Sequence, residues 1–148
     1  MTQVRLATSD DAPAIVAMGE RFHAFSGDAI SYCKESAFAT VTGLLSCGFV
    51  LIAEQDGAPV GMIGVIVAPM FFNAACHMAQ EAMWWVDDDA RKGGAAIALI
   101  RAAEREAAAR GAMRLQMVRL AKSPAHLADL YARLGYVQGE VTHTKDIK

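Results

Sequence analysis

The sequence predicts an α/β domain in which a mixed, mostly antiparallel sheet is flanked by helices. Apolar residues alternate with a period of two in several short stretches, and in others they recur every three or four residues. The hairpin signal Asp56-Gly57 joins two alternating stretches and indicates antiparallel pairing. The expected order of elements is β-α-α-β-β-β-α-β-α-β, and one domain is expected to span residues 1–148.

The first third of the chain is predicted to form a strand and two helices. Residues 4–6, Val-Arg-Leu, are predicted to form a short strand, and Ser9-Asp10-Asp11 then provides capping residues ahead of Pro13 in the first turn of a helix. One face of that helix is apolar and comprises Ile15, Met18, Phe22 and Phe25. A second helix is expected over 35–45, before Gly48.

The middle of the chain is predicted to be three strands. Residues 49–54 and 60–67 form a hairpin, a loop covers 69–75, and a longer strand covers 77–86. Regular alternation along this last strand divides its side chains between two faces. Gln80, Ala82, Trp84 and Val86 are expected on one face, and Glu81, Met83 and Trp85 on the other.

The final third is predicted to be helix, strand, helix and strand. The alanine-rich run over 94–110 has high helix propensity. Its expected apolar face consists of Ile97, Ile100, Ala103 and Ala107. A strand over 113–120, a helix over 124–134 and a last strand over 136–147 complete the chain.

Composition and charge exclude several classes of partner. The chain has 54% hydrophobic residues, 14 basic and 16 acidic residues and no basic run, so a nucleic-acid partner is not expected. No apolar stretch reaches the ~20 residues of a membrane span, and no signal-like segment opens the chain, so no membrane partner and a cytoplasmic location are expected. Three cysteines without a CxxC pair indicate reduced thiols, and the histidine spacing predicts no metal site.

The segment 86–96 carries the strongest chemical signal. It lies between a predicted strand and the N-terminus of the longest predicted helix, and Gly93 and Gly94 would let a ligand approach the backbone closely. The first N–H groups of a helix can hold a phosphate, beside which Arg91 and Lys92 add positive charge. The spacing alone is equally compatible with a flexible turn beside a solvated acidic run.

This segment resembles a known family. Arg91-Lys92-Gly93-Gly94-Ala95-Ala96 matches the R/Q-x-x-G-x-G/A signature of the GNAT superfamily of acyl-CoA-dependent N-acyltransferases. A longer family pattern, V-x-P-x-x-R-G-x-G-x-G, differs here at Asp88, Lys92 and Ala96. The later segment 130–136, LYARLGY, resembles the family's L-Y-x-x-x-G-F/Y. The sequence of residues 84–87, WWVD, is also similar to the corresponding segment of small GNAT proteins of phage and prophage origin.

The resemblance implies acetyl-CoA as the acyl-donor cosubstrate, without a metal. The pantetheine arm would lie against main-chain groups of Trp84, Trp85 and Val86, where the strand splays from its parallel neighbour. The pyrophosphate would meet the N–H groups of Lys92, Gly93, Gly94, Ala95 and Ala96, with charge from Arg91. Residues 87–89, three aspartates, are expected to face solvent or the amine entrance.

The resemblance also implies two catalytic residues. Tyr131 would protonate the departing thiolate, although the position alone also fits a packed aromatic residue. Glu81 is the only carboxylate within the strand 77–86 and could accept a proton from the ammonium, directly or through water. An outward-facing edge position is the alternative for Glu81, and a one-residue bulge would exchange it for Gln80.

The activity implied is transfer of an acetyl or short acyl group from acyl-CoA to a primary amine by direct attack. The amine could belong to a small molecule or a peptide, and homodimers are common in the family. The alternative is a non-catalytic acyl-CoA-binding or partner-binding domain with the same fold. The sequence carries no code for the particular amine.

Overall fold

A computed structural model describes residues 1–147 of the chain. It divides into two compact units, Met1–Val118 and a second that begins at Arg119. Each unit is described separately below. The expectation of a single domain over residues 1–148 stays a prediction.

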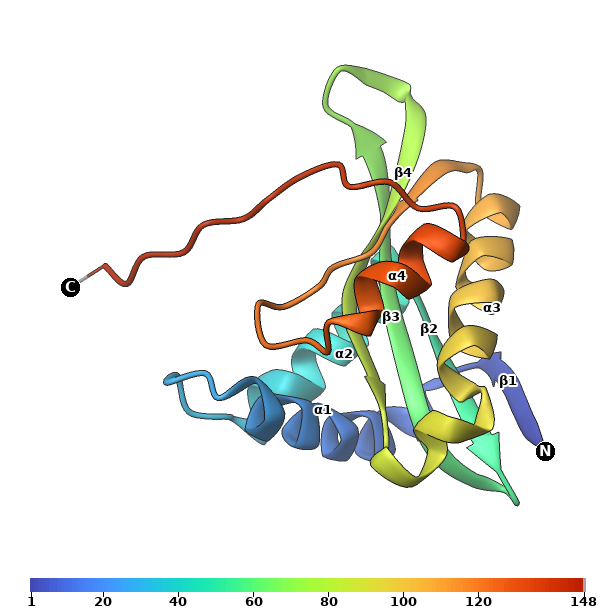
Figure 1. Cartoon of the computed structure of the whole chain (residues 1–148), viewed down its shortest axis with the longest axis vertical. Helices are drawn as coiled ribbons and strands as arrows, with labels where there is room; N and C mark the ends of the chain where they lie inside the picture. Colours follow the sequence, from blue (N-terminus) through green and yellow to red (C-terminus); the bar gives the residue numbers. More distant parts are fainter. Residues whose placement is uncertain (148) are drawn as a thin grey trace. The chain divides into compact units, whose positions relative to one another are not determined.

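The first unit is built on one five-stranded sheet in the order β1-β2-β3-β4-β5 (Figure 1). The strands are β1 Thr2–Leu6, β2 Gly48–Gln55, β3 Ala58–Met70, β4 Asn73–Val86 and β5 Ala112–Gln116. The first four pair antiparallel with their neighbours, and β5 pairs parallel with β4. The predicted mixed, mostly antiparallel sheet is confirmed.

Helices cover both faces of this sheet and create two cores. The helices are α1 Ala12–Ser26, after the short 3₁₀ turn η1 Ser9–Asp11, then α2 Lys34–Cys47, and α3 Ala95–Ala109, after the 3₁₀ turn η2 Asp88–Gly93. The core under α1 and α2 includes Val50, Ile52 and Met62, whereas the core under α3 includes Leu51, Ile63 and Val65. Alternate residues of each strand therefore serve opposite cores.

The buried face of α3 contains Ile100, Ala103 and Ala107 as predicted, and the prediction is wrong for Ile97. Leu99 and Ile100 are fully buried, but Ile97 is 45% exposed. The helix packs through its alanines at 95, 102, 103 and 107. These side chains are small, so they let the helix approach the sheet closely.

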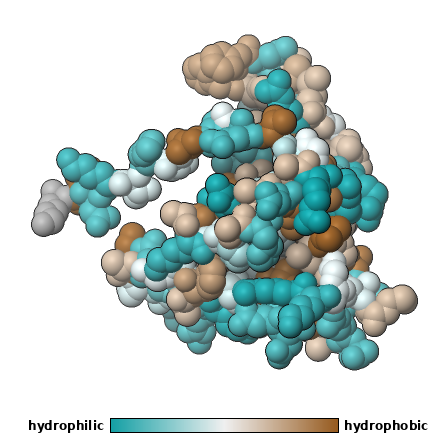
Figure 2. Space-filling model, in the orientation of Figure 1, coloured by the Kyte–Doolittle hydropathy of each residue, from teal (hydrophilic) through white to brown (hydrophobic). Residues whose placement is uncertain are grey.

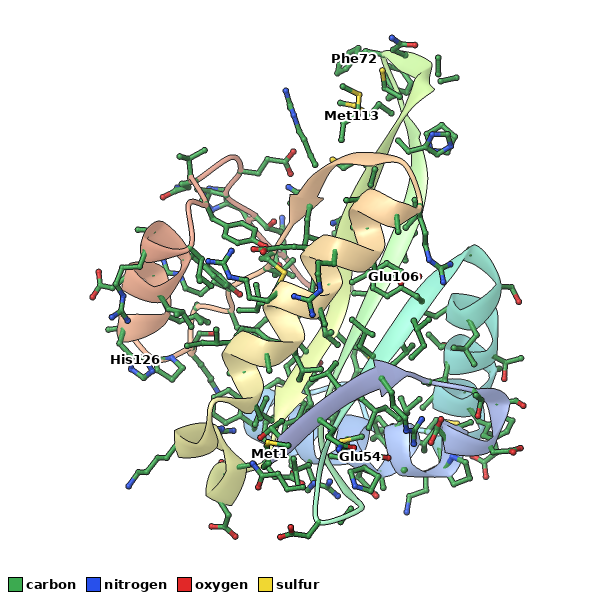
Figure 3. The ribbon with its side chains drawn as sticks, turned by 90° about the vertical axis from the view of Figure 1, so that its right-hand side faces the viewer. Met1, Glu54, Phe72, Glu106, Met113 and His126 are labelled. Atoms are coloured by element: carbon green, nitrogen blue, oxygen red, sulfur yellow. The ribbon has the colours of Figure 1, made fainter. Side chains whose placement is uncertain are left out.

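The hairpin that joins β3 and β4 is longer than predicted. The expected loop over 69–75 is wrong, because β3 runs to Met70 and β4 starts at Asn73. Only Phe71 and Phe72 form the tip, where they are 94% and 90% exposed. Figure 3 labels Phe72 at the end of this hairpin, and Figure 2 shows apolar surface at the same end of the molecule. β5 is shorter than predicted and ends at Gln116 rather than Leu120.

The second unit contains α4 His126–Arg133, within the helix predicted over 124–134. The Tyr131 and Tyr136 rings lie 5.6 Å apart, and the Tyr136 N–H donates to the Tyr131 carbonyl at 2.9 Å. The predicted last strand is wrong, because residues 136–147 form no strand in the described part of the chain. Alternating residues favour a strand only where a neighbouring edge accepts their backbone hydrogen bonds.

Within residues 1–147, every helix is too short or too polar to cross a bilayer.

Candidate functional site

The strands β4 and β5 part in the middle of the sheet. Their pairing covers His77–Gln80 of β4 and Ala112–Gln116 of β5, whereas β4 continues to Val86. In the described chain, the last six residues of β4 therefore pair through one edge only, with β3. Within residues 1–147 no strand pairs with the other edge of this segment, and at its end the Val86 carbonyl accepts a hydrogen bond from Arg91.

A β-bulge at Ala82 marks the same point on β4. Val65 of β3 pairs with Glu81, but the next residue back, Gly64, pairs with Met83. The extra residue reverses the alternation beyond it. Glu81 therefore shares the α3 face with Trp84 and Val86, whereas Met83 and Trp85 face α1 and α2. The regular alternation predicted for 77–86 is wrong for this reason.

Glu81 is buried at the place where the two strands separate. It is 8% exposed, so the alternative of an outward-facing edge residue is wrong, and it is the neighbouring Gln80 that is exposed. Its Oε2 accepts the backbone N–H of Val118 at 2.9 Å. Burial raises the pKa of Glu81 to about 7, although the hydrogen bond from Val118 opposes this rise. A carboxylate with this pKa is suited to accept a proton near neutral pH.

Side chains from α1 hold the end of β4. Arg21 pairs with both carboxylate oxygens of Asp87, at 2.8 and 3.1 Å, and the Trp85 indole N–H donates to the same carboxylate at 2.7 Å. Asp88 and Asp89 are exposed, as predicted, but Asp87 is half-buried and engaged in these contacts. No local pattern relates Arg21 to Asp87, because 66 positions separate them.

Arg91 is placed by the same end of β4. Its Nε donates to the Val86 carbonyl at 3.0 Å, and its Nη1 pairs with Asp88 at 2.7 Å. Its guanidinium lies over the rings of Trp85 and Phe25, 4.9 and 5.8 Å from their centroids. These contacts join η2 to both β4 and α1. A contact between Arg91 and a pyrophosphate stays a prediction.

The turn into α3 presents unpaired helix N–H groups beside two glycines. Gly94 has φ +80°, and a Cβ there would meet nothing within 4 Å, whereas a Cβ on Gly93 would lie 2.8 Å from Nε2 of Gln55. The first helical hydrogen bond runs from the Ala98 N–H to the Gly94 carbonyl at 3.0 Å. The N–H groups of residues 95–97 therefore have no acceptor within the helix. Space and donors together fit an anionic group.

Residues 21–136 match the model of the acetyltransferase (GNAT) family. The chain belongs to this family. The family uses acetyl-CoA, and the open edge of β4 with the donors of the α3 turn is a fitting arrangement for that molecule.

Solved structures of other proteins share the GNAT fold over the whole chain. A ribosomal-protein-alanine N-acetyltransferase from Brucella melitensis biovar Abortus 2308 aligns with a TM-score of 0.79 at 18% identity, covering 100% of both chains. A predicted acetyltransferase with acetyl-CoA from Clostridium acetobutylicum gives 0.79 at 14% identity, covering 99% of this chain and 96% of that one. An aminoglycoside acetyltransferase from an uncultured soil metagenomic sample gives 0.76 at 20% identity, covering 100% and 99%.

At these identities the likeness shows the fold alone. Among curated proteins, none matches the chain in sequence. The similarity to phage and prophage members has no support in these matches.

The two residues predicted to be catalytic lie in different units of this GNAT protein. Glu81 and the turn before α3 belong to the first unit, and Tyr131 lies on α4 in the second. The catalytic roles of Glu81 and Tyr131 stay predictions. Within the described residues, no three His, Cys, Asp or Glu side chains form a group that could hold a metal ion.

Proposed function

We propose that this protein is an acetyl-CoA-dependent N-acetyltransferase that transfers an acetyl or short acyl group to a primary amine. The observation that carries the proposal is the parting of β4 from β5 after Gln80, which opens a strand edge that leads into the donors at the start of α3. Membership of the GNAT acetyltransferase family supports the same reaction class. The three free cysteines fit a cytoplasmic protein.

Binding would use the backbone more than side chains. The pantetheine amides would pair with main-chain groups of β4 over Trp84–Val86, as an added strand does. The pyrophosphate would lie against the N–H groups that follow Gly94. Lys92, which is exposed, and Arg91 add positive charge beside it.

The chemistry would be a direct attack of the amine on the thioester. Glu81 removes a proton from the ammonium group, directly or through water, and the freed nitrogen forms a bond to the acyl carbon. Backbone N–H groups of β4 near Val86 polarise the carbonyl oxygen. The nitrogen releases its second proton to solvent, the carbon–sulfur bond breaks, and the thiolate takes a proton, for which the family resemblance offers the Tyr131 hydroxyl.

Ligand stabilisation tests the proposal most directly. Acetyl-CoA at 100 times its Kd should add about 2.7 kcal/mol to the free energy of unfolding, which corresponds to roughly 5–11 °C in Tm for a chain of this size. NAD and ATP serve as controls and should shift Tm much less. An unchanged Tm at millimolar acetyl-CoA contradicts the proposal. Binding without release of free thiol, over a broad panel of amines, would instead indicate the non-catalytic alternative.

A further inference from the structure

The hairpin of β3 and β4 extends beyond the strands on either side of it. The pairing of β2 with β3 ends at Ile66, and the pairing of β5 with β4 begins at His77. Within residues 1–147, the end of the hairpin over residues 67–76, called the ribbon below, therefore has no strand against either outer edge. Figure 1 shows the ribbon projecting from one end of the sheet.

The tip of the ribbon is the most exposed aromatic surface of the first unit. The rings of Phe71 and Phe72 lie 5.2 Å apart, edge to face, and almost all of both side chains is open to solvent. Ile66, where the ribbon begins, is 39% exposed, and Met113 is 70% exposed. Figure 3 labels Phe72 and Met113 at the same end of the molecule. Single exposed apolar residues are common, but a group of them marks an interaction site.

The ribbon lacks the charged side chains that usually keep exposed strand edges apart. Residues 57–80 contain no Asp, Glu, Lys or Arg. Exposed edges are protected by such charges, by proline or by bulges. Pro69 has no N–H to donate, and residues 74–76 of β4 lie opposite no residue of β3. These two features oppose the addition of one strand after another, but they leave the apolar side chains open to a single partner.

The area of this surface fits a second copy of the chain. A buried phenylalanine side chain contributes about 150–250 Å², so the four rings at the tips of two copies would bury roughly 500–900 Å². A stable interface needs about 1,200–2,000 Å² in total. The rings therefore supply up to about half of this area, and Ile66, Met70 and Met113 extend it. An uncharged surface can also face its own copy, because no like charges meet there.

A membrane surface fits the ribbon less well than a second copy does. Binding at a lipid interface combines apolar side chains with Lys or Arg that attract anionic headgroups, and residues 57–80 contain neither of these cations. Insertion would also carry the two outer edges of the ribbon into lipid, where nothing accepts or donates their backbone hydrogen bonds. In a dimer the same edges can stay in water while the side chains at the tip are covered.

We infer that two copies of this chain associate through their ribbons about a two-fold axis. Phe71 and Phe72 of each copy then pack against the ribbon of the other, and the contact is closed because the same surface is used on both sides. The ribbon lies at the start of β4, whereas Val86, which leads to the turn before α3, lies at its end. Association should therefore leave acetyl-CoA binding unchanged, and the inference does not rest on the proposed function.

Sedimentation equilibrium with matched variants tests the association. The wild type should be a dimer at micromolar concentrations, and Phe71→Lys should raise the Kd of the dimer by roughly tenfold or more. Ile30→Lys adds the same charge at an apolar residue that is 78% exposed outside the ribbon, and it should leave this Kd unchanged. Both side chains are exposed, so neither substitution should lower the Tm of the monomer. A monomeric wild type, or equal effects of the two substitutions, would overturn the inference.

Hydrogen exchange locates the contact. The amides of residues 67–76 should exchange more slowly as the concentration of the wild type rises, and this protection should be lost in Phe71→Lys. The hairpin turn at Asp56-Gly57, between β2 and β3, should exchange equally at every concentration. Protection that depends on concentration but lies only outside residues 67–76 would place the dimer contact elsewhere and overturn the inference.

Vesicles of phosphatidylcholine and phosphatidylserine test the membrane as the other partner. We expect the wild type and Phe71→Lys to remain in solution when the vesicles are sedimented. A wild type that is monomeric in solution and sediments with the vesicles, when Phe71→Lys does not, would assign the tip to a lipid surface and overturn the inference. A dimer that fails to bind acetyl-CoA would contradict the proposed function alone.

Discussion

The two halves of β4 are held in the sheet in different ways. From His77 to Gln80 the strand is paired on both edges, and its far end reaches the exposed hairpin tip. From Glu81 to Val86 one edge has lost β5, yet this half is more deeply buried and contains the only buried charged residue in the described chain. Side-chain contacts hold this half in place of a neighbouring strand. Glu81 bonds to the Val118 N–H, Asp87 pairs with Arg21, and Arg91 bonds to the Val86 carbonyl.

This difference shows how a sheet can leave a backbone edge open without losing order. The bulge at Ala82 directs Glu81 and Trp84 to one face, and the Glu81 carboxylate accepts a backbone N–H just beyond the end of β5. Arg21 and Asp87 secure the end of the strand to α1. The following predictions test whether the second half of β4 performs chemistry that the first half does not.

The largest effect is expected from the substitution of Glu81. Glu81→Gln keeps an oxygen that can accept the Val118 N–H but removes the proton acceptor, so kcat should fall by roughly 10² to 10⁴. Gln80→Ala, one residue earlier in the doubly paired half, should leave kcat within about threefold of wild type. Steady-state rates with one amine, corrected for amine ionisation, provide the comparison. A Glu81→Gln enzyme within threefold of wild type would leave water as the base.

The pH dependence of the same variant separates catalysis from folding. Because the pKa of Glu81 is raised to about 7, wild-type kcat should rise with pH through this value, and Glu81→Gln should lack the rise. The free energy of unfolding of the wild type should fall, rather than rise, as the pH increases through the same range. Between about 4.5 and 7 the folded state binds the extra proton, so stability falls with rising pH by on the order of 3 kcal/mol. Denaturant titrations of Glu81→Gln should lack this fall.

The sequence could predict those parts of the site that depend on neighbouring residues. The strand, the Gly93-Gly94 turn and the helix after it are local signals, and Glu81 stood out as the lone carboxylate in an apolar strand. The bulge at Ala82 could not be predicted, because the partner strand determines the register and no residue of β4 signals the extra position. The contact between Arg21 and Asp87 depends on how α1 packs, and a strand over 136–147 would have needed an available edge.

The next largest effect is expected at the turn into which β4 leads. Gly94→Glu places bulk and negative charge where the pyrophosphate should lie, so the Kd of acetyl-CoA should rise by about 10²-fold, because like charges in contact cost several kcal/mol. Gly57→Glu is a close control, since φ is +79° at Gly57 and +80° at Gly94, and a Cβ at either position would meet nothing within 4 Å. Backbone strain is then common to both variants. Equal affinities for acetyl-CoA would mean that the Gly94 turn serves the fold alone.

The smallest effect is expected from Asp87→Asn, which tests whether side chains do replace the missing strand. Asparagine has one side-chain oxygen, so it cannot accept from both Arg21 nitrogens and the Trp85 indole as Asp87 does. The free energy of unfolding should fall by about 1–2 kcal/mol, and the Kd of acetyl-CoA should rise a few-fold because the end of β4 is held less firmly. Asp89→Asn removes the same charge from an exposed position and should change unfolding by less than about 0.5 kcal/mol. If denaturant unfolding gives equal free energies for the two variants, the ion pair contributes nothing, and the second half of β4 is held by the packing of Trp85 and Val86 instead.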